Sequence, residues 1–316
     1  NSGEYKLMGL APYGKPKFKD LILNNLIDLK EDGSFRINMK YFNYATGLTM
    51  TNHKFSKLFG YPVRDPKKDL LKEFHMDIAS SIQAVTEEII LRITQNIVKD
   101  YKVNNLCLAG GVALNCVANG KLLKEKIFDK IWIQPASGDA GGSLGAALAY
   151  WHQELEMPRN KFSDQMKGSY LGPKFDNDYV ESKLKSLRAK YKKYNSDKIT
   201  SLTAKELATE KTVGWFQGRM EFGPRALGGR SILADPRSDK MQKDLNLKIK
   251  FRESFRPFAP SVLREDLKDW FELDEDSPYM LLVSEVKKEK QIKMSEKDQN
   301  LFGIEKLNIK RSIIPA

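Results

Sequence analysis

The spacing of apolar residues is most regular between His75 and Tyr101. Isoleucine and valine recur there at intervals of three and four residues, which is the period of one helix face. The stripe consists of Ile78, Ile82, Val85, Ile89, Ile93 and Ile97. We therefore predict a long helix from His75 to about Tyr101 that packs against the core through this stripe.

Two short apolar runs follow, and each leads into a glycine-rich turn. N-N-L-C-L-A precedes G-G-V-A-L-N-C-V-A-N-G-K-L-L, and K-I-W-I-Q precedes P-A-S-G-D-A-G-G-S-L-G-A-A-L-A-Y. The repeated order of strand, glycine turn and helix is typical of an α/β layout that binds ligands at the carboxyl ends of its strands. Elsewhere the pattern predicts a short helix at Leu21–Leu29 and another helix that opens with a capping box, T-A-K-E, at Thr203–Glu206.

A polar stretch broken by proline and glycine separates the two halves of the chain. We interpret residues 157–176 as a linker between a first domain, 1–156, and a second domain, 177–316. Each half is long enough to bury a core of its own. The predicted class is α/β, with an α+β second domain. The chain starts without methionine and stops inside a strand-like run, R-S-I-I-P-A, so we expect it to be a segment of a longer protein.

Composition narrows the choice of partners. The net charge is +12, but lysines are spread over the whole length, which favours a solvated basic surface over a nucleic-acid-binding face. No apolar run approaches the roughly 20 residues of a membrane span. Cys107 and Cys116 lie in apolar contexts and are predicted to be buried free thiols of a cytoplasmic protein. We therefore expect small-molecule partners rather than a membrane or nucleic acid, and homo-oligomerisation stays open.

The first glycine turn is a candidate nucleotide site. Backbone amides at Gly110 and Gly111 can meet phosphate oxygens at the start of the following helix. Asn115 and Asn119 are four residues apart, so they share a helix face and could reach a ribose or base. A tight connection with no ligand is the alternative interpretation of such a turn.

The second glycine turn is a candidate metal site. Asp139 precedes a helix, where it is either the N-cap or a ligand of a divalent cation beside nucleotide phosphates. Gly141 and Gly142 keep the helix start bare, and we count them among the cofactor-binding residues. Walker-type, dinucleotide-binding and nucleophile-elbow motifs are absent from the sequence. The histidines lie too far apart to form a local metal motif: His53, His75 and His152.

The densest positive charge lies in V-G-W-F-Q-G-R-M-E-F-G-P-R-A-L-G-G-R-S-I-L-A-D-P-R, at residues 213–237. Arginine presents a planar fork that binds phosphate or carboxylate in bidentate fashion, and glycine lets the backbone approach an anion. A second basic group follows in N-L-K-I-K-F-R-E-S-F-R-P-F. Nearby carboxylates are fewer than the cations, which favours a polyanion pocket over a solvated ion-pair network. The cations of the two groups are Arg219, Arg225, Arg230 and Arg237, followed by Lys248, Lys250, Arg252 and Arg256.

Four long motifs together resemble the O-carbamoyltransferase family. They are E-Y-K-L-M-G-L-A-P-Y-G, L-A-G-G-V-A-L-N-C-V-A-N-G, P-A-S-G-D-A-G-G-S-L-G-A-A and G-R-M-E-F-G-P-R-A-L-G-G-R-S-I-L-A-D-P-R, in that order along nearly the whole chain. The resemblance implies that the first domain is the C-terminal part of an actin/sugar-kinase/heat-shock ATPase-like domain. It implies that the second is a truncated YrdC-like domain with a twisted sheet.

The resemblance also implies a two-step reaction. Carbamoyl phosphate and ATP give carbamoyl adenylate and pyrophosphate in the YrdC-like domain, and the carbamoyl group then moves to a hydroxyl of the acceptor with the help of a divalent metal of the Fe or Mg/Mn type. By the same resemblance Gly110, Gly111 and Asn115 bind nucleotide, and Asp139 ligates the metal. The resemblance also selects six candidate catalytic cations that line the carbamoyl phosphate and ATP pocket: Arg219, Arg225, Arg230, Lys250, Arg252 and Arg256. The family's H-x-x-x-H metal motif does not occur in this sequence, so we expect this chain alone to be an incomplete enzyme.

Two other functions stay open at this stage. A threonylcarbamoyl synthase or transferase that acts on tRNA fits the basic charge and would need threonine and bicarbonate rather than carbamoyl phosphate. A non-catalytic nucleotide- or nucleic-acid-binding module would show salt-sensitive DNA or RNA binding. The acceptor cannot be identified, because no segment indicates a specific acceptor pocket.

Overall fold

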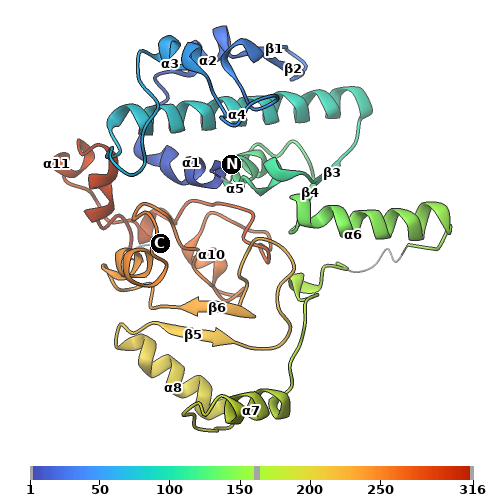
Figure 1. The fold of residues 1–316 in the computed structure, drawn as a ribbon, viewed down its shortest axis with the longest axis vertical. Coiled ribbons are helices and arrows are strands. Elements are labelled where there is room, and N and C mark those ends of the chain that lie inside the picture. The colour runs from blue at the N-terminus through green and yellow to red at the C-terminus, as the bar shows by residue number, and fades with distance from the viewer. Residues whose placement is uncertain (1–2, 160–163, 314–316) are drawn as a thin grey trace.

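One long helix organises the first half of the molecule. The structure is a computed structural model that describes residues 3–159 and 164–313 (Figure 1). The helix α4 (Glu73–Tyr101) confirms the predicted helix and begins slightly before it. Two short helices, α1 (Glu4–Leu10) and α2 (Lys19–Asn25), contact α4 from opposite sides.

A small layer covers the outer side of α4, at the top of Figure 1. It consists of α2, α3 (His53–Phe59) and an antiparallel hairpin of β1 (Ile27–Leu29) and β2 (Phe35–Ile37). The predicted helix at Leu21–Leu29 is therefore wrong beyond Asn25. Residues 27–29 alternate apolar, acidic and apolar, and this period of two lets them pair with β2 as a strand.

The predicted strand–turn–helix repeat lies on the other side of α4 and is confirmed. The strands β3 (Asn105–Leu108) and β4 (Lys130–Ile133) pair in parallel. The helix α5 (Cys116–Lys124) forms the crossover between them, and α6 (Asp139–Ala149) follows β4. Because the two strands run in the same direction, the chain has to return from the end of β3 to the start of β4, and α5 makes this return.

The faces of this sheet differ in burial. Leu106 and Ile133 are buried on one face, whereas Cys107 and Trp132, which are register partners, are exposed on the other. The prediction that Cys107 is a buried thiol is thus wrong, because successive residues of a strand point to opposite faces. Cys116, at the start of α5, is half-buried, and neither cysteine forms a disulfide.

The second half of the chain occupies the lower part of Figure 1. An antiparallel pair, β5 (Val213–Phe216) and β6 (Arg230–Leu233), is joined by the arginine loop, residues 217–229, which carries Arg219 and Arg225. The helices of this half are α7 (Asn177–Ser186), α8 (Ser196–Ala208), α9 (Met241–Asp244), α10 (Leu267–Trp270) and α11 (Glu296–Gln299).

Two details of this half correct the predictions. The helix α8 begins at Ser196, where Asn195 caps it, so Thr203 lies inside the helix and not at its start. The strand-like run at the end of the chain forms a single bridge, between Ser312 and Gln291, and residues 314–316 lie outside the described part. Of the predicted linker, residues 160–163 also lie outside it.

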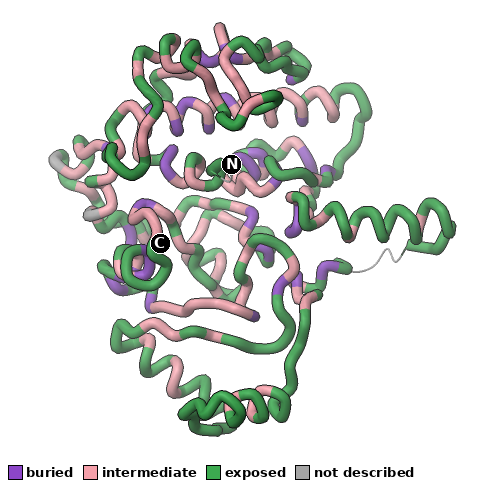
Figure 2. The backbone as a smooth tube through the Cα atoms, in the orientation of Figure 1, coloured by how far each residue is buried: buried purple, intermediate pink, exposed green. Residues whose placement is uncertain are grey.

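The hydrophobic core combines both halves. One cluster of buried residues includes Ala113, Ile133 and Ala136 from the first predicted domain and Tyr279 and Leu281 from the second. Figure 2 shows further buried segments on α4 and in the layers next to it. The boundary between the two domains stays a prediction.

The mixture of helices and small sheets is consistent with the predicted α/β class. Each of the sheets in the described ranges is two-stranded. Among those residues, no helix has both the length and the apolar character needed to cross a bilayer.

Candidate functional site

A cavity of about 400 Å³ lies where β3 and β4 end. Parallel strands place their carboxyl ends at the same edge of a sheet, so the two glycine turns meet there. The Gly110 amide donates to the Ser137 carbonyl over 2.9 Å, which ties one turn to the other. The lining residues are Ala109, Gly110, Gly111, Gln134, Ala136, Ser137, Gly138, Asp139, Gly141 and Gly142.

The cavity depends on glycine at two positions in particular. Gly110 has a φ of 98°, in the region that side chains disfavour. A Cβ at Gly141 would lie 2.1 Å from the Ala136 carbonyl oxygen, so only glycine lets α6 start this close to the end of β4. The structure therefore brings together the glycines and Asp139 that the sequence predicted as one site.

Asp139 is the first residue of α6, and its carboxylate is free. The residue before it, Gly138, occupies the N-cap position, so the alternative that Asp139 is the N-cap is wrong. Its side chain is exposed and makes no hydrogen bond or ion pair with the described residues. A carboxylate at a helix N-terminus beside a glycine-lined cavity fits one position in the coordination of a divalent cation. Residues 3–159 and 164–313 contain no group of three or more His, Cys, Asp or Glu side chains that could hold a metal by themselves.

Asn115 is occupied by structural contacts. Its side-chain oxygen accepts from the Ala118 amide and caps α5, and it exchanges hydrogen bonds of 3.0 and 3.2 Å with Gln83 of α4. A role of Asn115 toward nucleotide stays a prediction. The role of Gln83 could not be predicted from the sequence, because its partner Asn115 is distant in the chain. The sequence shows only that Gln83 is a polar residue beside the apolar stripe of α4.

Asn119 is buried and does not face the cavity. Its side-chain amide donates to the carbonyl oxygens of Ala113 and Leu281, over 2.8 and 3.1 Å. The prediction that it could reach a ribose or base is wrong, because its donors are used inside the protein. The spacing of Asn115 and Asn119 predicts a shared helix face, but it could not predict that the segment around Leu281 crosses α5 at this point.

Arg219 lies in the loop between β5 and β6, and Arg230 is the first residue of β6. Arg219 donates to the Gly172 carbonyl over 3.0 Å, and Arg230 donates to the Gln217 carbonyl over 3.0 Å. The Arg230 guanidinium also stacks on Phe216, 3.4 Å from its ring centroid. Neither arginine has a carboxylate partner among the described residues, so both cations keep capacity for an anion.

Arg225 reaches across to the first half of the chain. Its Nη2 donates to the Leu114 carbonyl over 3.2 Å, and its Nε is buried without a hydrogen-bond partner. Gly223, two residues earlier, lies so close to the Pro135 carbonyl that a Cβ would come within 3.1 Å of it. The arginine loop thus contacts both strand-to-helix turns that surround the glycine cavity.

Lys250, Arg252 and Arg256 form the second basic group. Burial lowers the pKa of Arg252, and the nearby Arg256 lowers it further. Arg256 lies over the ring of Tyr5 and pairs with Glu253 at 3.8 Å. The Lys250 side chain has neither a hydrogen bond nor an ion pair with the described residues, and its backbone amide donates to the Leu245 carbonyl over 2.8 Å. No hydrogen bond or ion pair among them connects this group with the arginine loop, so the structure holds the six cations as two groups.

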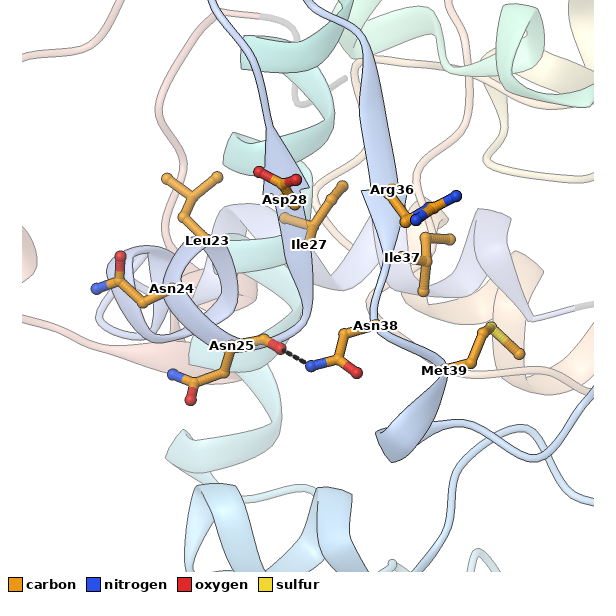
Figure 3. Close-up of a pocket in the computed structure, with 9 residues that line it drawn as sticks. All are labelled: Leu23, Asn24, Asn25, Ile27, Asp28, Arg36, Ile37, Asn38 and Met39. Carbon is orange, nitrogen blue, oxygen red and sulfur yellow. Dashed lines mark hydrogen bonds between the residues drawn. The ribbon is translucent and has the colours of Figure 1, made fainter.

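A larger, more open cavity of about 820 Å³ lies beside the β1–β2 hairpin (Figure 3). Asn38 donates to the Asn25 carbonyl at its edge over 2.9 Å, and Arg36 and Asp28 come from the two strands. None of the predicted site residues lines it. Its polar lining therefore does not contribute to the candidate site.

Sequence models of one protein family match both halves of the chain. The sequence model of the carbamoyltransferase N-terminus matches residues 1–148, and that of the carbamoyltransferase C-terminus matches residues 204–300. The chain belongs to the carbamoyltransferase family. The glycine cavity and Asp139 lie in the N-terminal match, and all six candidate cations lie in the C-terminal match.

The chain is similar to several curated proteins. It is 60% identical to an uncharacterized protein of Synechocystis sp., across 100% of this chain and 52% of the relative. It is 38% identical to the nodulation protein NolO of Bradyrhizobium diazoefficiens, across 91% of this chain and 50% of the relative. An uncharacterized protein of Methanocaldococcus jannaschii is 32% identical over 92% of the chain and 46% of the relative. The chain thus spans about half the length of these relatives.

Proposed function

We propose that this carbamoyltransferase, as part of a longer protein, makes carbamoyl adenylate from carbamoyl phosphate and ATP and passes the carbamoyl group to a hydroxyl of a small-molecule acceptor. The observation that carries the proposal is that two sites of different chemistry lie in the two family matches. A glycine-lined cavity with a free carboxylate lies in the N-terminal match, and cations with few carboxylate partners lie in the C-terminal match. The resemblance to actin-like and YrdC-like domains belongs to this proposal.

Adenylate formation is assigned to the cations. Carbamoyl phosphate and ATP are both polyanions, so their encounter requires dense positive charge that is already in place. The balance of atoms needs water: carbamoyl phosphate gives carbamate and phosphate, and the carbamate oxygen then attacks the α-phosphorus of ATP and releases pyrophosphate. Arg219, Arg230 and Arg252 are anchored by neighbouring groups and would hold phosphate oxygens with the donors left over. Lys250, whose side chain has no partner in the described part of the chain, would add a point charge.

Carbamoyl transfer is assigned to the glycine cavity. The Gly110 amide is engaged with Ser137, so donors to a nucleotide phosphate come from Gly111 and the first turn of α6. Asp139 would supply one ligand to a divalent metal, and the rest of the ligand set would come from outside the described residues. A bound metal would polarise the carbamoyl carbonyl or lower the pKa of the acceptor hydroxyl.

The test is carbamoyl-phosphate-dependent exchange of labelled pyrophosphate into ATP, with the Lys250→Ala variant. The Lys250 side chain has no hydrogen bond or ion pair with the described residues, and alanine keeps the backbone hydrogen bond to Leu245, so the substitution should affect substrate binding and leave the structure intact. Lys248→Ala is the matched control. Lys248 lies two residues before Lys250 in the sequence, but its side chain forms a surface ion pair with Asp244. The enzyme should be the Synechocystis relative in which the matched part is replaced by this chain, since the chain spans about half of that protein.

The proposal predicts exchange that depends on carbamoyl phosphate and that falls about tenfold or more in Lys250→Ala, as expected for the loss of one charge-assisted phosphate contact. Lys248→Ala should exchange at the original rate. Absence of exchange in the folded chimera, with metal added, would refute adenylate formation. Exchange that requires threonine and bicarbonate would favour the tRNA-modifying alternative instead.

A further inference from the structure

The helix α6 leaves the body of the molecule and carries an apolar surface into solvent. Figure 1 shows it projecting from the end of β4, and Figure 2 shows exposed residues along most of its length. Between Asp139 and Glu154 the helix and the turn that continues it contain no Asp, Glu, Lys or Arg. A helix that is apolar on all sides is a buried helix in a complete fold.

The side chains that this helix exposes are large. Leu148 is 45% exposed, Tyr150 61% and Trp151 46%, and Leu155 follows at 46%. Small residues precede them in α6: a Cβ at Gly142 or at Gly145 would meet nothing within 4 Å. Bare glycines one turn apart are the surface on which another helix or strand can pack closely.

The sheet next to α6 is uncovered in the same way. Cys107 and Trp132 face each other across the β3–β4 pair, and both are exposed. Parallel sheets occur almost only with both faces covered, because their crossover connections place helices on the faces. The helix and the sheet face are therefore two independent signs of the same missing cover.

We infer that α6 and the Cys107–Trp132 face of the sheet form a docking surface for an apolar segment of the same protein that lies outside residues 1–316. The relatives supply the reason for this choice of occupant. The Synechocystis protein matches all of this chain with 52% of its own length, and NolO matches with 50%, so a comparable length of chain remains in each to provide a cover. Since α6 begins at Asp139, the same segment would also close the glycine cavity.

The test compares the 316-residue chain with the chimera in which it replaces the matched part of the Synechocystis relative. Hydrogen exchange of the amides in α6 is measured in both proteins without any substitution. We expect α6 to exchange at least about tenfold more slowly in the chimera, because a covered helix opens less often than an exposed one. Equal exchange in both proteins would overturn the inference.

A substitution gives the second readout. Leu148→Glu should lower the Tm of the chimera by about 3 °C or more, since it places a charge in a covered apolar surface, and should leave the Tm of the 316-residue chain unchanged. Leu187→Glu is the matched control, because Leu187 at the end of α7 is 76% exposed and lies outside the docking surface. It should be neutral in both proteins.

Two results would count against this occupant. A neutral Leu148→Glu in the chimera would show that no flanking segment covers the helix. A 316-residue chain that dimerises in solution and becomes monomeric on Leu148→Glu, together with an unchanged chimera, would assign the surface to a second copy of this chain. Because the readouts are exchange and thermal stability, they are independent of whether the proposed carbamoyl transfer is correct.

Discussion

At the scale of single residues, Glu221 holds the arginine loop in shape. Its buried carboxylate accepts hydrogen bonds from the backbone amides of Leu227, Gly229 and Arg230, at 2.7, 2.8 and 3.3 Å. Burial alone would raise the pKa of this group, but the backbone hydrogen bonds outweigh it, and the pKa lies below the ordinary value of 4.5. The ionised form is thus the one that the fold stabilises.

We predict that Glu221→Gln lowers the free energy of unfolding by about 1.5–3 kcal/mol near neutral pH, the value of a hydrogen bond to a charged group. A depressed pKa contributes stability that is present above the unfolded-state value and is lost as the pH falls through the folded-state value. The difference between the two proteins should therefore shrink as the pH falls below the ordinary pKa of 4.5 and through the lower pKa of the folded state.

Urea denaturation at a series of pH values measures this difference. Glu206→Gln is the control, because that exposed carboxylate pairs with Lys211 at the surface. A difference between Glu221→Gln and the original protein that is constant down to the acid end would contradict the role of the charge.

At the scale of elements, the start of α8 depends on a local cap. The Asn195 side chain accepts from the Lys198 amide over 2.9 Å and satisfies one of the free amides of the first turn. We predict that Asn195→Ala destabilises the helix by about 1 kcal/mol, the usual value of such a cap. Thr203→Ala should be neutral or slightly stabilising, because Thr203 lies in the helix interior, where alanine is the better residue. Circular dichroism during thermal unfolding tests both, and a larger loss in Thr203→Ala would refute the observed boundary.

The elements of the structure, set against those expected from the sequence, show which of them can be predicted from sequence. The stripe of α4 and the two glycine turns were predictable, because helical periodicity and glycine requirements are local properties of the chain. The convergence of Gly110 and Asp139 was predictable too, since it follows from parallel pairing alone. The cations were not, because an arginine side chain is long and its partner depends on tertiary packing. Arg225 contacts Leu114, which lies far from it in the sequence.

At the scale of the whole molecule, one buried amide joins the two halves of the chain. Asn119 of α5 donates to the carbonyl oxygens of Ala113 and Leu281, and the segment that carries Leu281 fits tightly against α5. A Cβ at Gly120 would lie 2.2 Å from the Val283 carbonyl oxygen, so no other residue permits this approach. The crossing places part of the C-terminal family match against the crossover helix of the N-terminal match.

We predict that Asn119→Leu, which keeps the approximate volume but removes the donors, lowers the free energy of unfolding by about 2–3 kcal/mol, since two buried carbonyl groups lose their partner. The segment around Leu281 should be released first, because the hydrogen bond to Asn119 connects it to α5. Hydrogen exchange of residues 279–286 measures this release, and Asn96→Leu, which removes a surface contact with Asp100, is the control. If exchange accelerates equally throughout the molecule in Asn119→Leu, the two halves unfold as one cooperative unit and the amide does not act as a separate connection between them.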